Sequence, residues 1–183
     1  MFIQTEETPN PATLKFIPGR VVLADGTRDY RSLDESEGSP LASRIFGVDG
    51  VSGVFLGHDF ITVTKDEAEW PHIKPAVLGA IMEHYLSGLP TLVEGSEEEA
   101  EESFDEADAE TVAVIKELIE TRVRPAVAND GGDITFQGFR EGVVYLHMRG
   151  ACAGCPSSTA TLKQGIENLL RHFVPDVTEV RPV

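Results

Sequence analysis

The hydrophobic and polar positions in the first ninety residues predict short strands followed by a long helix. Four short runs have the composition of strands, at residues 2–5, 13–17, 51–56 and 60–64. The second run stops at Pro18-Gly19. The last two runs flank Gly57-His58-Asp59, and this spacing predicts a β-hairpin.

Two helices are predicted in the same region. Ser39 is a good N-cap and Pro40 suits the first helical position, so a short helix should run to residue 46. A longer helix should begin at Trp70-Pro71 and end at Ser87-Gly88. Its apolar residues repeat every four positions: Ile73, Val77, Ile81 and Tyr85. A complete small α+β domain is therefore predicted for residues 1–93.

A second α+β domain is predicted over residues 110–183, in the order α-β-β-α-β. Val112, Ile115, Leu118 and Ile119 mark an amphipathic helix that should end near Arg124-Pro125. A glycine turn at 129–133 should lead to strands near 134–137 and 143–148, joined by Glu141-Gly142. The last helix has one apolar face, and Pro175 should separate it from a final strand at 177–180; that face consists of Leu162, Ile166, Leu169, Leu170 and Phe173.

The segment between these domains, residues 94–109, is predicted from its composition to be an acidic flexible linker. From Glu94 to Glu110 there are eight Glu, two Asp and no Lys or Arg, which accounts for −10 of the net charge of −16. Such a block repels itself and buries little surface. The rest of the chain is only −6, with no basic region of the kind that binds nucleic acid, so we expect no nucleic-acid partner.

Location is predicted from the absence of targeting patterns. No apolar run approaches the roughly 18–20 residues that span a bilayer, so we expect no membrane partner. The first residues have neither the basic and apolar regions of a signal peptide nor an Arg-rich presequence. The expectation from this pattern is a cytoplasmic protein.

The candidate chemistry lies in the loop Arg149-Gly150-Ala151-Cys152-Ala153-Gly154-Cys155-Pro156-Ser157-Ser158, which holds the only two cysteines. The loop is predicted to join a strand to a helix N-terminus that Ser157, Ser158 or Thr159 can cap. The helix dipole there favours negative charge, which should make both thiols ionise more easily. Small residues around them let backbone amides approach a bound sulfur or metal.

Three kinds of site fit this motif. A zinc site usually takes four protein ligands, and His147 on the preceding strand is a weak candidate to add to the two thiolates. A thiol–disulfide oxidoreductase also uses CxxC, usually in a thioredoxin-like unit, whereas here two strands precede the motif. Iron–sulfur clusters generally use four thiolates, so two chains would each have to supply Cys152 and Cys155. The spacing alone leaves all three open.

A family resemblance favours the third kind. The cysteine loop, the following 161–167, Arg124-Pro125 and Asp130-Gly131-Gly132-Asp133 closely resemble the C-terminal domain of NifU-like proteins. The first half is similar to the N-terminal domain of Nfu-type scaffold proteins, at Thr8-Pro9-Asn10-Pro11, 14–16, 39–42, Gly50-Val51 and 59–63.

The resemblance implies an iron–sulfur scaffold or carrier, not a conventional enzyme. Cys152 and Cys155 of two copies would hold a labile [4Fe–4S] cluster between them, with a [2Fe–2S] form left open. The partners implied are an upstream cluster donor and apo iron–sulfur client proteins. Because the mitochondrial members carry a presequence, the resemblance implies a bacterial-type cytoplasmic protein.

The remaining polar residues show no catalytic pattern. His58, His72 and His84 have no carboxylate or nucleophile at a suitable spacing, and we expect surface or core roles for them. The first domain therefore carries no visible chemistry, and we predict that it docks clients or modulates the second domain. Gly165 inside the last helix costs about 1 kcal/mol relative to Ala, and close packing on the sheet is the expected reason.

Overall fold

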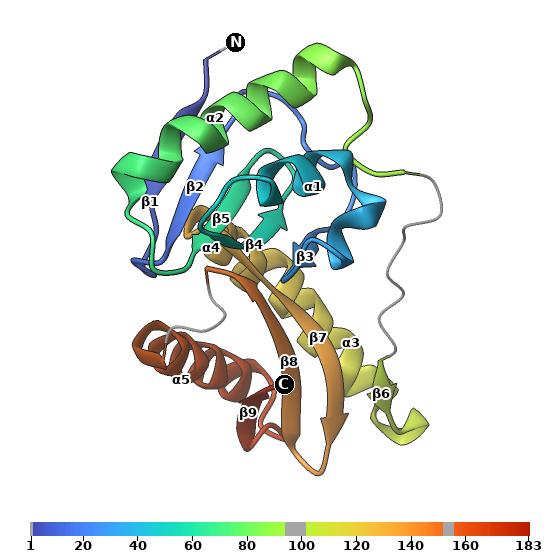
Figure 1. The fold of residues 1–183 in the computed structure, drawn as a ribbon. Helices are drawn as coiled ribbons and strands as arrows, with labels where there is room; N and C mark the ends of the chain where they lie inside the picture. Colours follow the sequence, from blue (N-terminus) through green and yellow to red (C-terminus); the bar gives the residue numbers. More distant parts are fainter. Residues whose placement is uncertain (1, 94–101, 152–155) are drawn as a thin grey trace. The chain divides into compact units, whose positions relative to one another are not determined.

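The computed structural model of the chain describes residues 2–93, 102–151 and 156–183, with the backbone alone for 156–159. It divides into two compact units, Met1–Glu98 and Glu99–Val183 (Figure 1). Both combine helices with a sheet, so the predicted α+β class is confirmed. No helix in the described part of the chain is long and apolar enough to cross a membrane.

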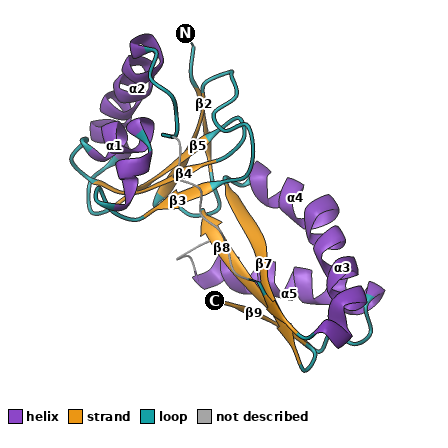
Figure 2. Cartoon of the chain, turned by 90° about the vertical axis from the view of Figure 1, so that its right-hand side faces the viewer, coloured by secondary structure: helices purple, strands orange, loops and turns teal. Residues whose placement is uncertain are grey.

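The first unit is an antiparallel sheet with two helices on one face (Figures 1 and 2). Its strands lie in the order β1-β2-β5-β4-β3, and every neighbouring pair is antiparallel. Along the chain the elements are β1 Gln4–Glu7, β2 Thr13–Ile17, β3 Arg28–Tyr30, η1 Glu35–Gly38, α1 Pro40–Phe46, β4 Val51–Leu56, β5 Ile61–Lys65 and α2 Trp70–Ser87.

Local signals in this unit produce the elements they predict. Ser39 Oγ accepts a hydrogen bond from the Ala42 backbone N at 3.1 Å, which confirms it as the N-cap of α1. Gly88 follows α2 with φ of 73°, the left-handed conformation that ends many helices. One apolar core joins the sheet to both helices, with Leu41 and Ile45 from α1 and Val77 and Ile81 from α2.

The second unit has a mixed four-stranded sheet in the order β6-β7-β8-β9. Its elements are β6 Ser103–Phe104, η2 Glu106–Asp108, α3 Ala109–Leu118, the π-helix η3 Ile119–Val123, α4 Arg124–Asn129, β7 Gly132–Arg140, β8 Val143–Gly150, α5 Pro156–Phe173 and β9 Glu179–Pro182. The central pair β7–β8 is antiparallel, whereas β6 and β9 run parallel to their neighbours. Chain segment 151–178, with α5, is therefore a crossover between parallel strands.

The first helix of this unit does not end at Arg124-Pro125, so that prediction is wrong. The chain continues from α3 through the π-turn η3 into α4, with Pro125 in the first turn of α4. A proline inside a helix lacks an N–H and crowds the carbonyl one turn earlier. In the π-turn just before Pro125, backbone hydrogen bonds join residues five apart instead of four. The chain therefore stays helical through Pro125.

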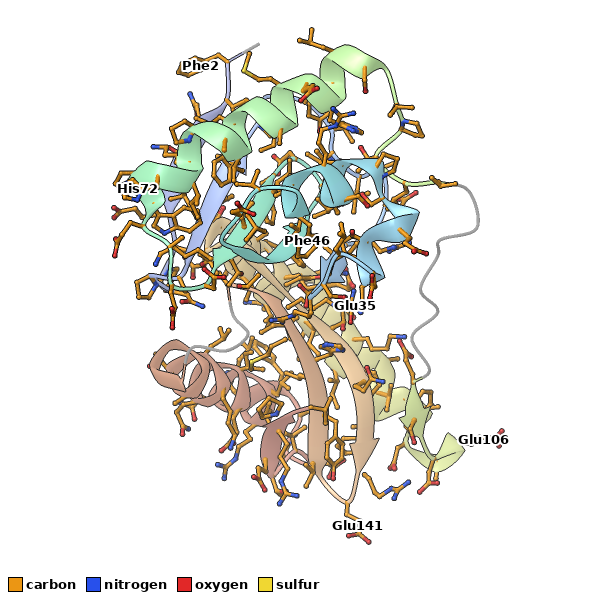
Figure 3. All side chains as sticks on the ribbon, in the orientation of Figure 1. Phe2, Glu35, Phe46, His72, Glu106 and Glu141 are labelled. Carbon is orange, nitrogen blue, oxygen red and sulfur yellow. The ribbon has the colours of Figure 1, made fainter. Side chains whose placement is uncertain are left out.

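The β7–β8 hairpin is longer than predicted, and its tip is as predicted. Glu141 and Gly142 join the strands with φ of 52° and 79°. The Glu141 side chain points away from the hairpin at its tip (Figure 3). Both strands extend to the end of the unit that carries the cysteines, where Gly132 pairs with Gly150.

Part of the predicted linker 94–109 forms regular elements. Residues 94–101 lie outside the described residues. Ser103–Phe104 forms β6, and Lys116 Nζ donates to both carboxylate oxygens of Glu102 at 2.8 and 2.7 Å. The linker boundaries remain a prediction, and its last residues belong to the fold of the second unit.

Candidate functional site

Cys152 and Cys155 themselves lie outside the described residues, as do the side chains of Ser157, Ser158 and Thr159. The chain on both sides of the cysteines is described. β8 ends at Gly150, Ala151 is buried at 2% exposure, and α5 begins at Pro156. The cysteines therefore belong to the connection between the carboxyl end of a strand and the start of a helix. This is where ligands bind in many sheets with crossover helices.

The start of this connection is fixed by the neighbouring turn. The Ala151 backbone N donates to the Gly131 carbonyl oxygen at 3.2 Å. Gly131 and Gly150 have φ of 80° and 66°, in the left-handed region that a side chain would strain. Of the two glycines in the predicted turn, Gly131 therefore has the positive φ. Gly132 instead begins β7.

An ion pair with a buried carboxylate holds this turn. Arg124 Nε and Nη2 donate to Asp133 Oδ1 and Oδ2 at 2.8 and 2.9 Å, a bidentate pair. Asp133 is only 3% exposed. The hydrogen bonds to Asp133 raise the pKa of Arg124 above its usual value, and Glu120, 2.5 Å from Arg124 Nη1, adds to this. The pair links α4 to the first residues of β7, which pair with the start of the cysteine loop at Arg149 and Gly150.

Sequence reasoning had not identified this pair as a functional support. Both residues stood in the quoted motifs, Arg124-Pro125 and 130–133, without an assigned role. Their sequence separation of nine residues matches no local pairing rule, because a turn lies between them. One signal could have indicated the pair: the two motifs contain an arginine and an aspartate, which have opposite charges, on either side of the turn.

The structure gives no further support to a zinc site. His147 lies on β8, opposite Thr135, on the face away from buried Leu146 and Met148. Among residues 2–93, 102–151 and 156–183, no group of three or more His, Cys, Asp or Glu is placed to hold a metal ion. The cysteine loop is not covered by this search, so the zinc alternative rests on the cysteines alone.

The histidines of the first unit have structural surroundings. His58 Nδ1 lies 2.9 Å from the Leu23 carbonyl oxygen. His84 is fully buried, and neither ring nitrogen has a hydrogen-bond partner among the described residues. Burial lowers its pKa, and the charge of Arg44 lowers it further.

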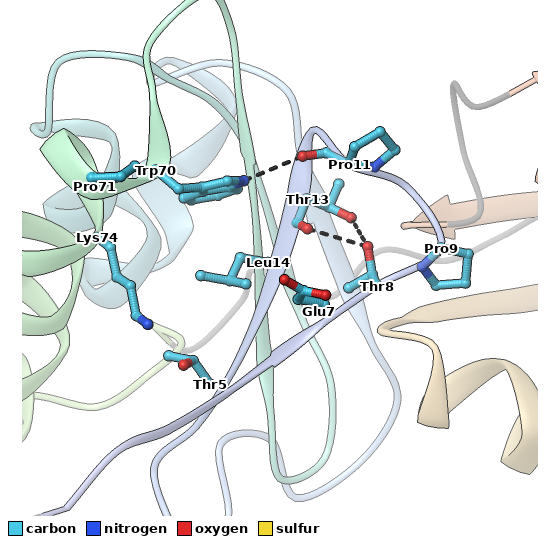
Figure 4. Close-up of a pocket in the computed structure, with 10 residues that line it drawn as sticks. All are labelled: Thr5, Glu7, Thr8, Pro9, Pro11, Thr13, Leu14, Trp70, Pro71 and Lys74. Carbon is cyan, nitrogen blue, oxygen red and sulfur yellow. Dashed lines mark hydrogen bonds between the residues drawn. The ribbon is translucent and has the colours of Figure 1, made fainter.

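A groove of about 900 Å³ lies in the first unit (Figure 4). It runs between the β1–β2 hairpin and the start of α2, with Glu7 and Lys74 among its lining residues. Trp70 Nε1 donates to the Pro11 carbonyl oxygen at 3.2 Å, and Thr8 and Thr13 share a hydrogen bond through their hydroxyl groups. Trp70 thus fixes the helix start to the turn at 8–11, and sequence reasoning missed the groove beside it.

Two small α+β units, with a CxxC sequence between a strand and the crossover helix of the second, define a class of two-domain α+β proteins. The chain matches the family described as "Scaffold protein Nfu/NifU N terminal" at residues 3–88 and the NifU-like domain at residues 115–181. This chain belongs to the Nfu/NifU-like family.

Relatives from three organisms are similar over nearly the whole chain. NifU-like protein 4, mitochondrial, of Arabidopsis thaliana is 50% identical over 98% of this chain and 65% of its own length. Two proteins carry the name "NFU1 iron-sulfur cluster scaffold homolog, mitochondrial". The one from Drosophila ananassae is 52% identical over 100% of this chain and 64% of its own length. The one from Homo sapiens is 48% identical over 100% of this chain and 72% of its own length. The chain spans about two thirds of the length of these relatives.

The prediction of a bacterial-type cytoplasmic location is contradicted. All three relatives are named mitochondrial. The prediction was inferred from the first residues of the sequence, and an address segment is separate from the folded domains. The sequence of those domains, which is what these relatives share, does not encode it.

Proposed function

We propose that this protein is an iron–sulfur cluster scaffold and carrier. Cys152 and Cys155 of two copies hold a [4Fe–4S] cluster between them and pass it to apo-proteins, after an upstream donor has supplied it. The observation that carries the proposal is the ligand count. A cluster generally takes four thiolates, whereas the chain has two cysteines, both in its NifU-like domain.

The surroundings of the loop support this chemistry. The first backbone N–H groups of α5 have no partner within the helix, and the helix dipole favours a thiolate at Cys155. The Arg124–Asp133 pair and the Gly131–Ala151 hydrogen bond fix the strand end next to Cys152. The protein would contribute positioned ligands and no catalytic residue, so we propose a carrier, not an enzyme.

Release would follow by ligand exchange. An incoming client thiolate forms a bond to one iron while the bond from that iron to Cys152 or Cys155 breaks. The displaced thiolate takes up a proton, and no electron is transferred. A site shared between two copies leaves ligands accessible to the client, because neither copy encloses the cluster.

Reconstitution under anaerobic conditions tests the proposal. After incubation with iron and sulfide, we expect a brown dimer with about four irons per two chains. Cys152→Ser and Cys155→Ser should each lose the cluster. A variant that still reconstitutes normally would rule out the assignment, and about two irons per two chains would indicate a [2Fe–2S] cluster instead.

The alternative from another class is a thiol–disulfide oxidoreductase. It predicts a colourless monomer with an intrachain disulfide between Cys152 and Cys155 that forms and reduces reversibly. A colourless protein that retains zinc would indicate a structural metal site. Visible absorption, metal content and mass therefore separate the three kinds of site.

The first unit contributes client docking in this proposal. It has a groove of about 900 Å³, and its described residues contain no group of metal ligands. Cluster transfer by the full chain can be compared with transfer by a chain that begins at residue 99. Equal transfer to every client would contradict the docking role.

A further inference from the structure

The last helix of the second unit carries apolar residues that the core does not fully cover. Ile166 and Leu170 are buried in the core, at 3% and 0% exposure. Leu162 and Leu169 are only partly buried, and Phe173 is 46% exposed. The predicted apolar face of α5 therefore packs on the core along one side and leaves a partly exposed edge at Leu162, Leu169 and Phe173.

Gly165 lies next to this edge on the exposed side of α5. A Cβ added at Gly165 would meet nothing within 4 Å, so the prediction that close packing on the sheet explains this glycine is wrong. A glycine inside a helix is destabilising relative to alanine. The fold of a single copy gives no reason for its presence.

The glycine borders an apolar groove. Beside α5, the groove of about 280 Å³ is lined from η3 and α4 by Val123, Ala126 and Val127, with Arg122 at one end. From α5 it is lined by Leu162, Gly165 and Leu169. Leu162, Gly165, Leu169 and Phe173 follow one another at steps of three, four and four residues. This is the spacing at which one helix contacts another.

We propose that this groove receives a second copy of the chain in the cluster-loaded dimer, with Gly165 as the point of closest approach between two α5 helices. The inference rests on the proposed function, in which the site is incomplete without a partner copy. Gly165 is nine residues from Pro156, or about 14 Å along the helix. The groove is therefore within reach of a partner that shares the cluster at the start of α5.

The geometry of a shared cluster sets the direction of the contact. In the proposed contact both α5 helices begin near the shared cluster and run side by side in the same direction, with the two-fold axis between them. Each copy then presents the same residues to the other, as a two-fold interface requires. Without a side chain at Gly165, the two helix backbones can approach closely.

The groove alone is too small to hold two copies together. A stable interface uses roughly 20–30 residues on each side. The groove and its apolar stripe offer fewer than half of that. The contact therefore adds to the cluster–thiolate bonds, and loss of the cluster separates the copies.

A pair of glycines makes the test specific. Gly79 in α2 is also exposed inside a helix, and an added Cβ there also meets nothing within 4 Å. Gly165→Leu and Gly79→Leu make the same change in the two units. As apo-proteins, both should be monomers that melt at or above the temperature of the unchanged chain.

After anaerobic reconstitution with iron and sulfide, the dimer dissociation constant is measured by mass analysis on dilution. We expect Gly165→Leu to weaken the dimer at least tenfold and Gly79→Leu to leave it unchanged. Ala126→Arg, which places a charge in the same groove, should weaken it as well. This second variant keeps the test valid if Gly165→Leu alters the helix.

The outcomes separate this inference from the function on which it rests. If the unchanged chain forms no cluster-containing dimer, the proposed function and the interface are both wrong. If it does, and both groove variants dimerise as Gly79→Leu does, only the interface is wrong. Normal dimerisation with slower cluster transfer to a client apo-protein would also overturn it, since the groove would then belong to the client.

Discussion

The two units differ in the hydrogen bonding of a buried titratable side chain. In the second unit, Asp133 is 3% exposed and receives two hydrogen bonds from Arg124. In the first, His84 is fully buried without a hydrogen bond to either ring nitrogen. The carboxylate holds the turn before β7, whereas the histidine lies in α2 with its ring edge-to-face against Tyr85. The buried carboxylate of the second unit therefore has a positioning role that the buried histidine of the first unit lacks.

The largest effect should come from breaking the ion pair. Arg124→Met removes both hydrogen bonds to the buried Asp133 carboxylate and should lower the unfolding free energy of the second unit by about 3 kcal/mol. Circular dichroism during urea unfolding measures it. Glu120→Gln is the matched control, since it breaks only an exposed contact to the same arginine and should cost less than about 0.5 kcal/mol.

The only tryptophan of the chain assigns the effect to a unit. Trp70 lies in the first unit, so its fluorescence reports the unfolding of that unit. Arg124→Met should leave the fluorescence transition unchanged. Equal cost for Arg124→Met and Glu120→Gln would contradict the positioning role of the pair.

The next effect is a pH dependence of the first unit. The folded pKa of His84 is lowered from 6.5 by burial and by Arg44. Below pH 6.5 the unfolded chain therefore binds a proton that the folded chain does not, and the unfolding free energy falls as the pH decreases. Above pH 6.5 the histidine is neutral in both states and contributes no pH dependence.

Substitution isolates this contribution. Trp70 fluorescence in urea at pH 7.5 and 5.5 should show a smaller loss of stability in His84→Leu than in the unchanged chain. His72→Gln, at an exposed position of the same helix, should retain the full loss. An identical pH dependence in the two variants would show that other groups cause it.

The smallest expected change in unfolding free energy comes from replacing a helical glycine by alanine, and it should be the same in both units. Gly79→Ala and Gly165→Ala place a methyl group in open space on a helix and should each stabilise its own unit by about 0.5–1 kcal/mol. Fluorescence measures the first, and circular dichroism the second. A destabilised Gly165→Ala would show that the single copy does require this glycine.

Elements with local signals were predictable from the sequence. The Ser39 cap, the Gly88 helix end and the hairpin tip at Glu141-Gly142 each depend on a few adjacent residues. Strands that depend on distant partners were missed. β3 has three residues and β6 two, and both exist because they pair with longer strands.

The location of the cysteine loop was predictable from the sequence, and the contacts that support it were not. The cysteine spacing and the flanking motifs identified the loop and its family. The Arg124–Asp133 pair and the groove at Gly165 depend on how α4 is positioned, and the π-turn before it has no recognised sequence signal. Cys152 and Cys155 as ligands remain a prediction, whereas the ion pair beside their loop was not predicted.

The π-turn at Ile119–Val123 has a consequence for chain length. Apolar residues on this helical course recur every four positions, at Ile115, Ile119, Val123 and Val127, and all four are buried. In a regular α-helix each such step would turn the side chain by about 40°, and the wider π-turn absorbs part of that drift. Deleting one residue from 119–123 would rotate everything after it by about 100° and carry Arg124 away from Asp133. This segment should therefore accept many substitutions but no insertion or deletion, so homologous sequences should align through it without a gap.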